Sequence, residues 1–175
     1  MGAANAAREL QDSLARAVPS CVITCGFAGG LNPALRVGEL VFQADDSFSA
    51  KTSLARPGTF HCAPRVAVMP AEKLTLWQET GADAVEMESG VIRSICRERG
   101  IPSATLRVIS DAAGDSLPLD FNALMTPEFQ MNWGKFAGQL LRQPSKIPEL
   151  MAFQRQIGAC AVRLAAVLRD ILSPR

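Results

Sequence analysis

Residues 81–111 read GADAVEMESGVIRSICRERGIPSATLRVISD, and two apolar, strand-like runs in this stretch each end in polar side chains. Between the two runs, residues 89–99 have the apolar spacing of a helix that Gly100 would end. Strand, helix and strand of these lengths are typical of a βαβ unit. The stretch therefore predicts an α/β fold.

The polar residues at the two strand ends are the candidates for chemistry. Glu88 and Ser89 follow the first run, and Ser110 and Asp111 follow the second. Open α/β sheets bind their ligands beyond the carboxyl ends of parallel strands. We therefore expect a ligand site where both ends of residues 81–111 meet.

The composition of the chain fits one soluble globular domain. Its 175 residues are 48% hydrophobic and 20% charged, which is enough apolar material for a single core. A net charge of +1 without a long basic cluster argues against nucleic acid as a partner. No apolar run approaches the ~20 residues of a membrane span and no signal region opens the chain, which predicts a cytoplasmic protein.

The cysteines favour reduced thiols over disulfides or a metal site. The chain has five cysteines without a CxxC pair, and His61 is its single histidine. His61 lies in residues 45–64, which lack periodicity and are expected to form a loop. A histidine in such a loop is more often solvated than catalytic.

The remaining segments extend the α/β pattern into a single domain, with residues 1–122 as its core and residues 123–175 as C-terminal helices. We expect helices over residues 3–17, 70–81, 123–141 (interrupted near Thr126 and Pro127) and 147–172, and strands over residues 20–26, 37–44 and 65–69. The apolar stripe of the last helix fits core packing, a partner subunit or an apolar ligand.

The glycines after the first predicted strand leave two alternatives open. Gly26, Gly29 and Gly30 allow a tight turn and a close approach of backbone N–H groups. Such a turn either joins two strands and does nothing more, or forms an anion or sugar site.

Three motifs occur in order along the chain. They are GFAGGLNPALRVGELV (residues 26–41), AVEMES (residues 84–89) and LRVISDAA (residues 106–113). In this order and spacing they resemble the nucleoside phosphorylase and methylthioadenosine/adenosylhomocysteine nucleosidase superfamily, over the chain from the first helix to about Asn122. MPAEKLTLWQETGADAVEMES and SLPLDFNALM are most similar to the hopanoid-associated phosphorylase branch.

This resemblance implies a three-layer phosphorylase/hydrolase-like fold with a mixed central sheet and a C-terminal helical extension. It also implies cleavage of the N-ribosidic bond of an adenine-type purine nucleoside, in a protein that forms homo-oligomers. The reaction leaves positive charge on the sugar and negative charge on the departing base. No cofactor or metal is implied, and phosphate would be the co-substrate of a phosphorolysis.

The resemblance also implies a role for each motif residue. Glu88 would accept hydrogen bonds from ribose hydroxyls, with Met87 packed against the sugar and Glu86 beside them as a further binding residue. Asp111 resembles the residue that protonates or hydrogen-bonds the purine N7, a role that needs a raised carboxyl pKa. Ser110 would position Asp111.

The arginine of the third motif has two possible roles. Arg107 resembles the family's arginine that helps to hold the nucleophile, water or phosphate, near the sugar. The alternative is an ion pair with Glu86 or Glu88. For the base itself, residues 64–68 should approach the purine, and Phe60 is the nearest aromatic candidate to stack on it.

Two departures from the family pattern bear on catalysis. Phe27 stands where the family usually offers phosphate or water a small or hydroxyl side chain, which leaves the backbone N–H groups of Ala28 and Gly29 as donors. The family's first strands, which supply a catalytic acid or phosphate-binding groups, would precede Met1, so we expect either an upstream start or a natural truncation. A nucleoside-binding module without turnover, or a self-assembling domain, is the alternative function.

Overall fold

A mixed six-stranded sheet in the order β3-β2-β6-β1-β5-β4 forms the centre of the molecule. The computed structural model describes residues 2–50, 52–126 and 130–173. The strands are β1 (Val22–Gly30), β2 (Leu40–Ala44), β3 (Arg56–Pro57), β4 (Phe60–Cys62), β5 (Ala84–Glu86) and β6 (Ser103–Asp111). The helices are α1 (Ala3–Arg16), α2 (Pro70–Thr80), α3 (Ser89–Glu98), α4 (Phe121–Leu124), α5 (Trp133–Arg142) and α6 (Ile147–Leu172), with a 3-10 turn η1 (Pro144–Lys146).

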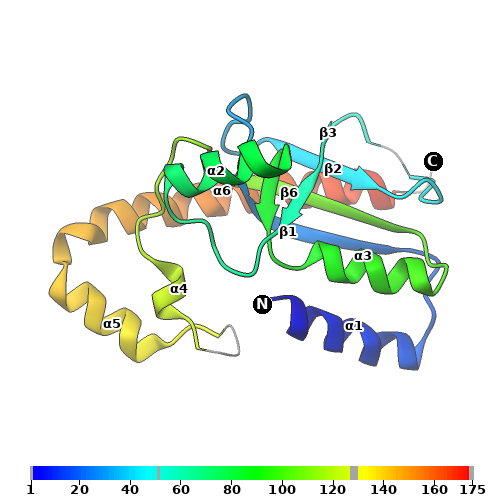
Figure 1. The fold of residues 1–175 in the computed structure, drawn as a ribbon, viewed down its shortest axis with the longest axis horizontal. Helices are drawn as coiled ribbons and strands as arrows, with labels where there is room; N and C mark the ends of the chain where they lie inside the picture. Colours follow the sequence, from blue (N-terminus) through cyan, green and yellow to red (C-terminus); the bar gives the residue numbers. More distant parts are fainter. Residues whose placement is uncertain (1, 51, 127–129, 174–175) are drawn as a thin grey trace.

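Helices cover both faces of this sheet. Figure 1 shows α6 running behind the sheet, while α3 and α1 lie side by side on the other side. On the α6 side, Leu106 and Val108 of β6 pack with Val167 of α6. On the opposite side, Leu14 of α1 packs with Ile95 of α3. The predicted α/β fold with a mixed sheet and a C-terminal helix is confirmed.

β6 is the central element, because all nine of its residues are buried. Alternate residues of a strand point to opposite faces. Ala104, Leu106 and Val108 join the core against α6, and burial of each large aliphatic side chain stabilises the fold by about 1.5–3 kcal/mol. By the same alternation Thr105 and Arg107 point to the other face, which therefore carries buried polar side chains.

The strand directions differ from the predicted βαβ unit. β1 lies between β5 and β6, parallel to β6 and antiparallel to β5. The expectation that the two strands of residues 81–111 run parallel is therefore wrong. Their ends still meet, since Gly29 of β1 pairs with Val85 of β5 on one side and with Asp111 of β6 on the other.

The glycines predicted as a turn belong to a strand. β1 continues without a break through Gly26, Gly29 and Gly30, and a bulge in its pairing with β6 lies at Ala28 and Gly29. The pairing partners on both sides keep this segment extended, which local turn chemistry alone did not predict.

Three other segments also differ from expectation. Residues 45–64 contain β3 and β4 in place of a continuous loop, because short strands paired at the sheet edges need no pattern of their own. Residues 65–69 form no strand. The expected helix over residues 123–141 is replaced by α4, a Met125–Met131 bridge and α5, and Pro127 lies outside the described residues.

Four helices were predicted within one residue of their observed ends. These are α1, α2, α3 and α6. Gly81 caps α2 with φ 64°, and Gly100 follows α3 with φ 66°. Both values lie in the left-handed region that glycine adopts readily. Among the helices of the described residues, none has the length and hydropathy needed to cross a membrane.

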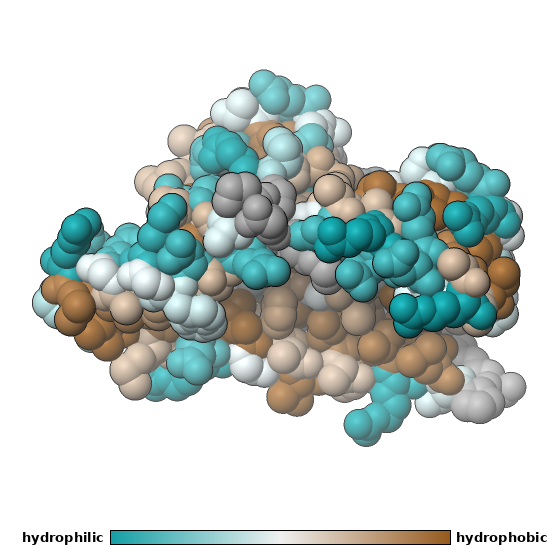
Figure 2. All heavy atoms as spheres, turned by 90° about the horizontal axis from the view of Figure 1, so that it is seen from below, coloured by the Kyte–Doolittle hydropathy of each residue, from teal (hydrophilic) through white to brown (hydrophobic). Residues whose placement is uncertain are grey.

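α5 extends away from the sheet. None of its side chains is buried, and Trp133 and Leu141 are highly exposed. At the beginning of α6, Ile147 and Met151 are also exposed. Figure 2 shows apolar side chains at the end of the molecule that α5 forms.

Candidate active site

The glycines of β1 leave room for two polar side chains of β6. Gly26 pairs with Arg107, and Gly29 pairs with Asp111. A Cβ atom on Gly26 would lie 3.4 Å from Nη1 of Arg107, and one on Gly29 would lie 3.2 Å from Oδ2 of Asp111. Larger residues at these positions would crowd both side chains. The GFAGG segment therefore makes room for Arg107 and Asp111 because its glycines have no side chains.

Arg107 and Glu86 form a buried ion pair. Nη2 of Arg107 lies 2.7 Å from Oε2 of Glu86, and the two side chains are 4% and 1% exposed. Glu86 also accepts hydrogen bonds from the Ser89 hydroxyl and from the backbone N–H groups of Ser89 and Glu88. Arg107 therefore makes the ion pair that the sequence offered as the alternative to its role at the nucleophile.

The pKa of Glu86 reflects these contacts. Burial by itself would raise the pKa, but the hydrogen bond and charge of Arg107, together with the N–H groups of Ser89 and Glu88, outweigh burial and hold the pKa below its ordinary value. Glu86 is thus a carboxylate at neutral pH. It fixes the start of α3 and the guanidinium of Arg107 at the same time.

Glu88 lies at the edge of this cluster. Its Oε2 is 3.8 Å from Nη2 of Arg107, and its Oε1 accepts a hydrogen bond of 2.9 Å from the backbone N–H of Gly2, just before α1. With 22% of its side chain exposed, Glu88 is more accessible than Glu86. A ligand can therefore reach Glu88 more easily than Glu86.

Asp111 belongs to a second polar cluster. The Ser110 hydroxyl donates to Oδ1 of Asp111 at 2.6 Å, and Nζ of Lys73 forms an ion pair with Oδ2. Ser110 also donates to the carbonyl oxygen of Ala28 at 3.2 Å. Ser110 thus connects Asp111 with β1.

Lys73 was absent from the sequence-based site. It lies in α2 with no solvent exposure, and its Nζ also donates to the carbonyl oxygens of Ala112 and Asp115 at 2.8 and 2.9 Å. Lys73 precedes Leu76 and Trp77, which pack on the core, by three and four residues. That spacing places a lysine on the inner face of the helix, and it is the signal that could have identified Lys73.

One cavity of 420 Å³ joins these elements. Its volume lies within the ~300–1,000 Å³ typical of ligand pockets. Of the predicted site residues, Phe27, Ala28, Gly29, Glu86, Met87, Glu88, Ser110 and Asp111 line it. Arg107 is not a lining residue, but it contacts two glutamates that are, Glu86 and Glu88.

The cavity also has an apolar wall. The wall consists of Leu117, Phe121 of α4, Met125 directly after α4, and Phe153 and Ile157 of α6. The rings of Phe121 and Phe153 lie with their centroids 6.2 Å apart. Phe60, expected to stack on a base, packs instead with the core around β1 and does not line the cavity.

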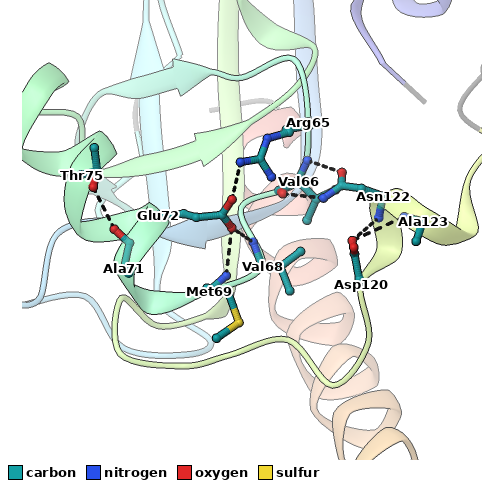
Figure 3. Close-up of polar contacts among 10 residues, drawn as sticks. All are labelled: Arg65, Val66, Val68, Met69, Ala71, Glu72, Thr75, Asp120, Asn122 and Ala123. Atoms are coloured by element: carbon teal, nitrogen blue, oxygen red, sulfur yellow. Dashed lines mark hydrogen bonds and ion pairs between the residues drawn. The ribbon is translucent and has the colours of Figure 1, made fainter.

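Residues 65–68 form the rim where the base was expected, and side chains hold them in place (Figure 3). The Asn122 amide accepts from the Val66 N–H and donates to the Val66 carbonyl, both at 2.9 Å. Glu72 of α2 accepts from the Val68 N–H at 2.8 Å and pairs with Arg65. These contacts replace the strand pairing that was expected for this segment.

Comparison with known families identifies the group to which the chain belongs. The model of the phosphorylase superfamily matches residues 43–143, more than half of the 175 residues. The chain belongs to the phosphorylase superfamily. The match includes both clusters around Glu86 and Asp111, while β1 lies outside it.

Solved structures share this superfamily fold. A 5′-methylthioadenosine/S-adenosylhomocysteine nucleosidase from Colwellia psychrerythraea, in complex with adenine, matches with a TM-score of 0.65 and 17% identity over 98% of this chain and 74% of that one. The nucleosidase from Campylobacter jejuni matches with 0.57 and 20% over 83% and 77%. Futalosine hydrolase of Helicobacter pylori matches with 0.57 and 20% over 70% and 68%. At such identities the likeness establishes the fold alone.

Proposed function

We propose that this chain cleaves the N-ribosidic bond of an adenine-type purine nucleoside, by hydrolysis or phosphorolysis. One observation carries the proposal: a single cavity is lined by carboxyl groups from two clusters, Glu88 beside Glu86 in one and Asp111 in the other. The reaction needs one group to steady the developing positive charge of the sugar and another to serve the departing base. Membership of the phosphorylase superfamily supports this reading of the cavity.

In this proposal each lining residue has one role. Glu88 accepts hydrogen bonds from the ribose hydroxyls, and Met87 packs against the sugar. Asp111 donates a proton or a hydrogen bond to N7 of the base, with Ser110 fixing the carboxyl. The 2.6 Å contact from Ser110 to Asp111 supports the last assignment.

The nucleophile side rests on Arg107. Arg107 lies 2.7 Å from Glu86 and 3.8 Å from Glu88 and does not line the cavity, so in this proposal it helps to hold the nucleophile indirectly, by ordering Glu88 next to the sugar. Phosphate is the co-substrate of the phosphorolysis form of the proposal. No cofactor or metal is needed, because carboxylates and a guanidinium supply the charges.

The substrate side of the proposal includes an apolar substituent. The resemblance to the hopanoid-associated branch points to a nucleoside with a lipid-like group, and the wall of Leu117, Phe121 and Phe153 offers such a group an apolar surface.

The proposal also places the protein in the cytoplasm and makes it a homo-oligomer. The exposed Trp133 and Leu141 of α5 support self-association, which light scattering of the purified protein tests.

A second candidate function is nucleoside binding without turnover. Phe27 lines the cavity with 40% exposure, where the family usually offers a small or hydroxyl side chain. An aromatic ring at this place gives phosphate or water no side-chain hydrogen bond. Adenine binding without bond cleavage would favour this candidate.

The experiment is to incubate the protein with adenosine, methylthioadenosine and adenosylhomocysteine, each with and without phosphate, and to quantify free adenine. Release of adenine supports the proposal, and dependence on phosphate distinguishes phosphorolysis from hydrolysis. An apolar 5′ substituent should lower KM relative to adenosine. Absence of release from every nucleoside, with adenine still bound, would replace the proposal by the second candidate.

A further inference from the structure

Lys73 is a buried cation to which the proposed reaction gives no role. Its side chain is fully buried in α2, and its Nζ has three oxygen partners: Oδ2 of Asp111 and the carbonyl oxygens of Ala112 and Asp115. An ammonium group has three N–H donors, whereas a neutral amine has two. The carbonyl oxygens of Ala112 and Asp115 accept hydrogen bonds from two of these donors, and the positive charge forms an ion pair with the Asp111 carboxyl.

Lys73 and Ser110 contact the two oxygens of the Asp111 carboxyl. Ser110 donates to Oδ1 at 2.6 Å, and Lys73 pairs with Oδ2. The side chain of Asp111 is 7% exposed, so water gives its charge little stabilisation. A buried carboxylate without a counter-ion is strongly disfavoured, and Lys73 supplies that counter-ion.

Other charged groups near Asp111 have partners of their own. They are Asp115 in the following loop, Glu86 and Glu88 at the end of β5, Arg107 of β6 and Arg65 before α2. Arg107 pairs with Glu86, and Arg65 pairs with Glu72. Within the described part of the chain, Lys73 is the cation in contact with Asp111.

We propose that Lys73 is a positioning residue for Asp111, which orients its carboxyl toward the base and stabilises the carboxylate formed when the proton leaves. This inference rests on the proposed function. In the step, the C1′–N9 bond breaks and its electron pair passes to the base. The O–H bond of Asp111 breaks as the N7–H bond forms. Water adds its oxygen to C1′ and gives its proton to solvent. Lys73 keeps all its protons and faces the new negative charge.

The same contacts tie this role to the shape of the site. Lys73 holds the chain just after β6 through Ala112 and Asp115, so one side chain fixes the strand end and the carboxyl together. α2 is itself anchored by the Glu72 contacts with Val68 and Met69. Asp111 is thus connected through Lys73 to the rim of the cavity at residues 65–68.

The first test measures the Asp111 carboxyl directly, without any substrate. Carbon-13 NMR follows the aspartate carboxyl signals with pH, and the Asp111 signal is the one lost in Asp111→Asn. In Lys73→Met its titration midpoint should rise by about one pH unit or more, because the carboxylate loses its counter-ion. Lys73→Gln, whose amide can still donate to a carbonyl, is measured in parallel and should give the same shift. Lys146→Met, which removes an exposed lysine of η1, is the matched control and should leave the midpoint unchanged.

The second test uses methylthioadenosine cleavage. Lys73→Met should lower kcat about 10- to 100-fold with KM within about threefold, and should move the basic limb of the pH–rate profile to higher pH. In an Asp111→Asn background the same change should have no further effect, because Lys73 acts through Asp111.

Two results would overturn the inference. One is an Asp111 midpoint that does not move when Lys73 is replaced by Met or Gln. The other is a loss of kcat of equal size with and without the Asp111 carboxyl. A wild-type protein that cleaves no nucleoside would refute the proposed function instead, since the NMR midpoint still decides whether Lys73 controls Asp111.

Discussion

The two buried ion pairs next to the glycines of β1 use similar chemistry for different purposes. Arg107 and Glu86 meet at 2.7 Å, and Glu86 is further occupied by Ser89 and by the start of α3. Lys73 and Asp111 meet at the end of β6, where Asp111 lines the cavity beside Ser110. The first pair fixes the backbone at the start of α3, and the second pair presents the Asp111 carboxyl to the cavity. Burial and ion pairing alone therefore do not identify a catalytic residue.

The largest expected effect comes from removing the acid of the second pair. Asp111→Asn keeps the shape of the side chain but has no proton of comparable acidity to give. Adenine release from methylthioadenosine should fall about 10²- to 10⁴-fold. Asp12→Asn, an exposed position on α1, is the matched control for a lost aspartate. Full activity of Asp111→Asn would exclude Asp111 as the acid.

Removing the cation of the first pair should mainly affect stability. Arg107→Met leaves the Glu86 carboxylate buried without its counter-ion, so the free energy of unfolding should fall by about 3–5 kcal/mol. Urea denaturation followed by circular dichroism measures this change. Arg8→Met, on the exposed side of α1, should leave stability nearly unchanged. An equally small effect of both variants would show that the first pair is not structural.

Filling the space that β1 leaves beside Asp111 should have a smaller effect, on stability. Gly29→Ala would place a Cβ 3.2 Å from both Asp111 Oδ2 and Val85 Cγ1, and should cost about 1–3 kcal/mol of stability. Gly158→Ala in α6 meets nothing within 4 Å and should stabilise the helix by about 0.5–1 kcal/mol. Thermal unfolding of both variants compares them. Equal stabilisation by the two alanines would contradict the tight fit at Gly29.

The smallest expected effect is a pH dependence that belongs to Glu86. Because the pKa of Glu86 is lower in the folded protein, its stabilisation is present above the ordinary value of 4.5 and is lost as the pH falls through the lower folded pKa. The free energy of unfolding should therefore decrease with acid. In Glu86→Gln that decrease should be weaker, whereas Glu79→Gln, at an exposed position of α2, should retain it.

The sequence predicted the elements of the fold better than their directions. Apolar periodicity located α1, α3 and α6 because each packs one face on the core. It could not show that β5 runs antiparallel to β1, because strand direction depends on pairing partners far along the chain. For the same reason Gly26 and Gly29 were expected in a turn although they lie in β1.

The site was predicted from local motifs, and what was missed came from elsewhere in the chain. Glu88 and Asp111 stand in recognisable motifs, and both line the cavity. Lys73 lies 38 positions before Asp111 and meets it because α2 packs against the loop after β6. The apolar wall around Phe121 and Phe153 likewise arises where α4 meets α6. The catalytic roles assigned to Glu88 and Asp111 stay predictions.

The most direct test of the central claim is a crystal structure of the protein grown with adenine. We expect the base in the cavity between Asp111 and the rim at residues 65–68, with N7 within hydrogen-bonding distance of the Asp111 carboxyl and with Lys73 still paired to that carboxyl. Adenine bound away from Asp111, or a cavity that stays empty at saturating adenine, would contradict that claim.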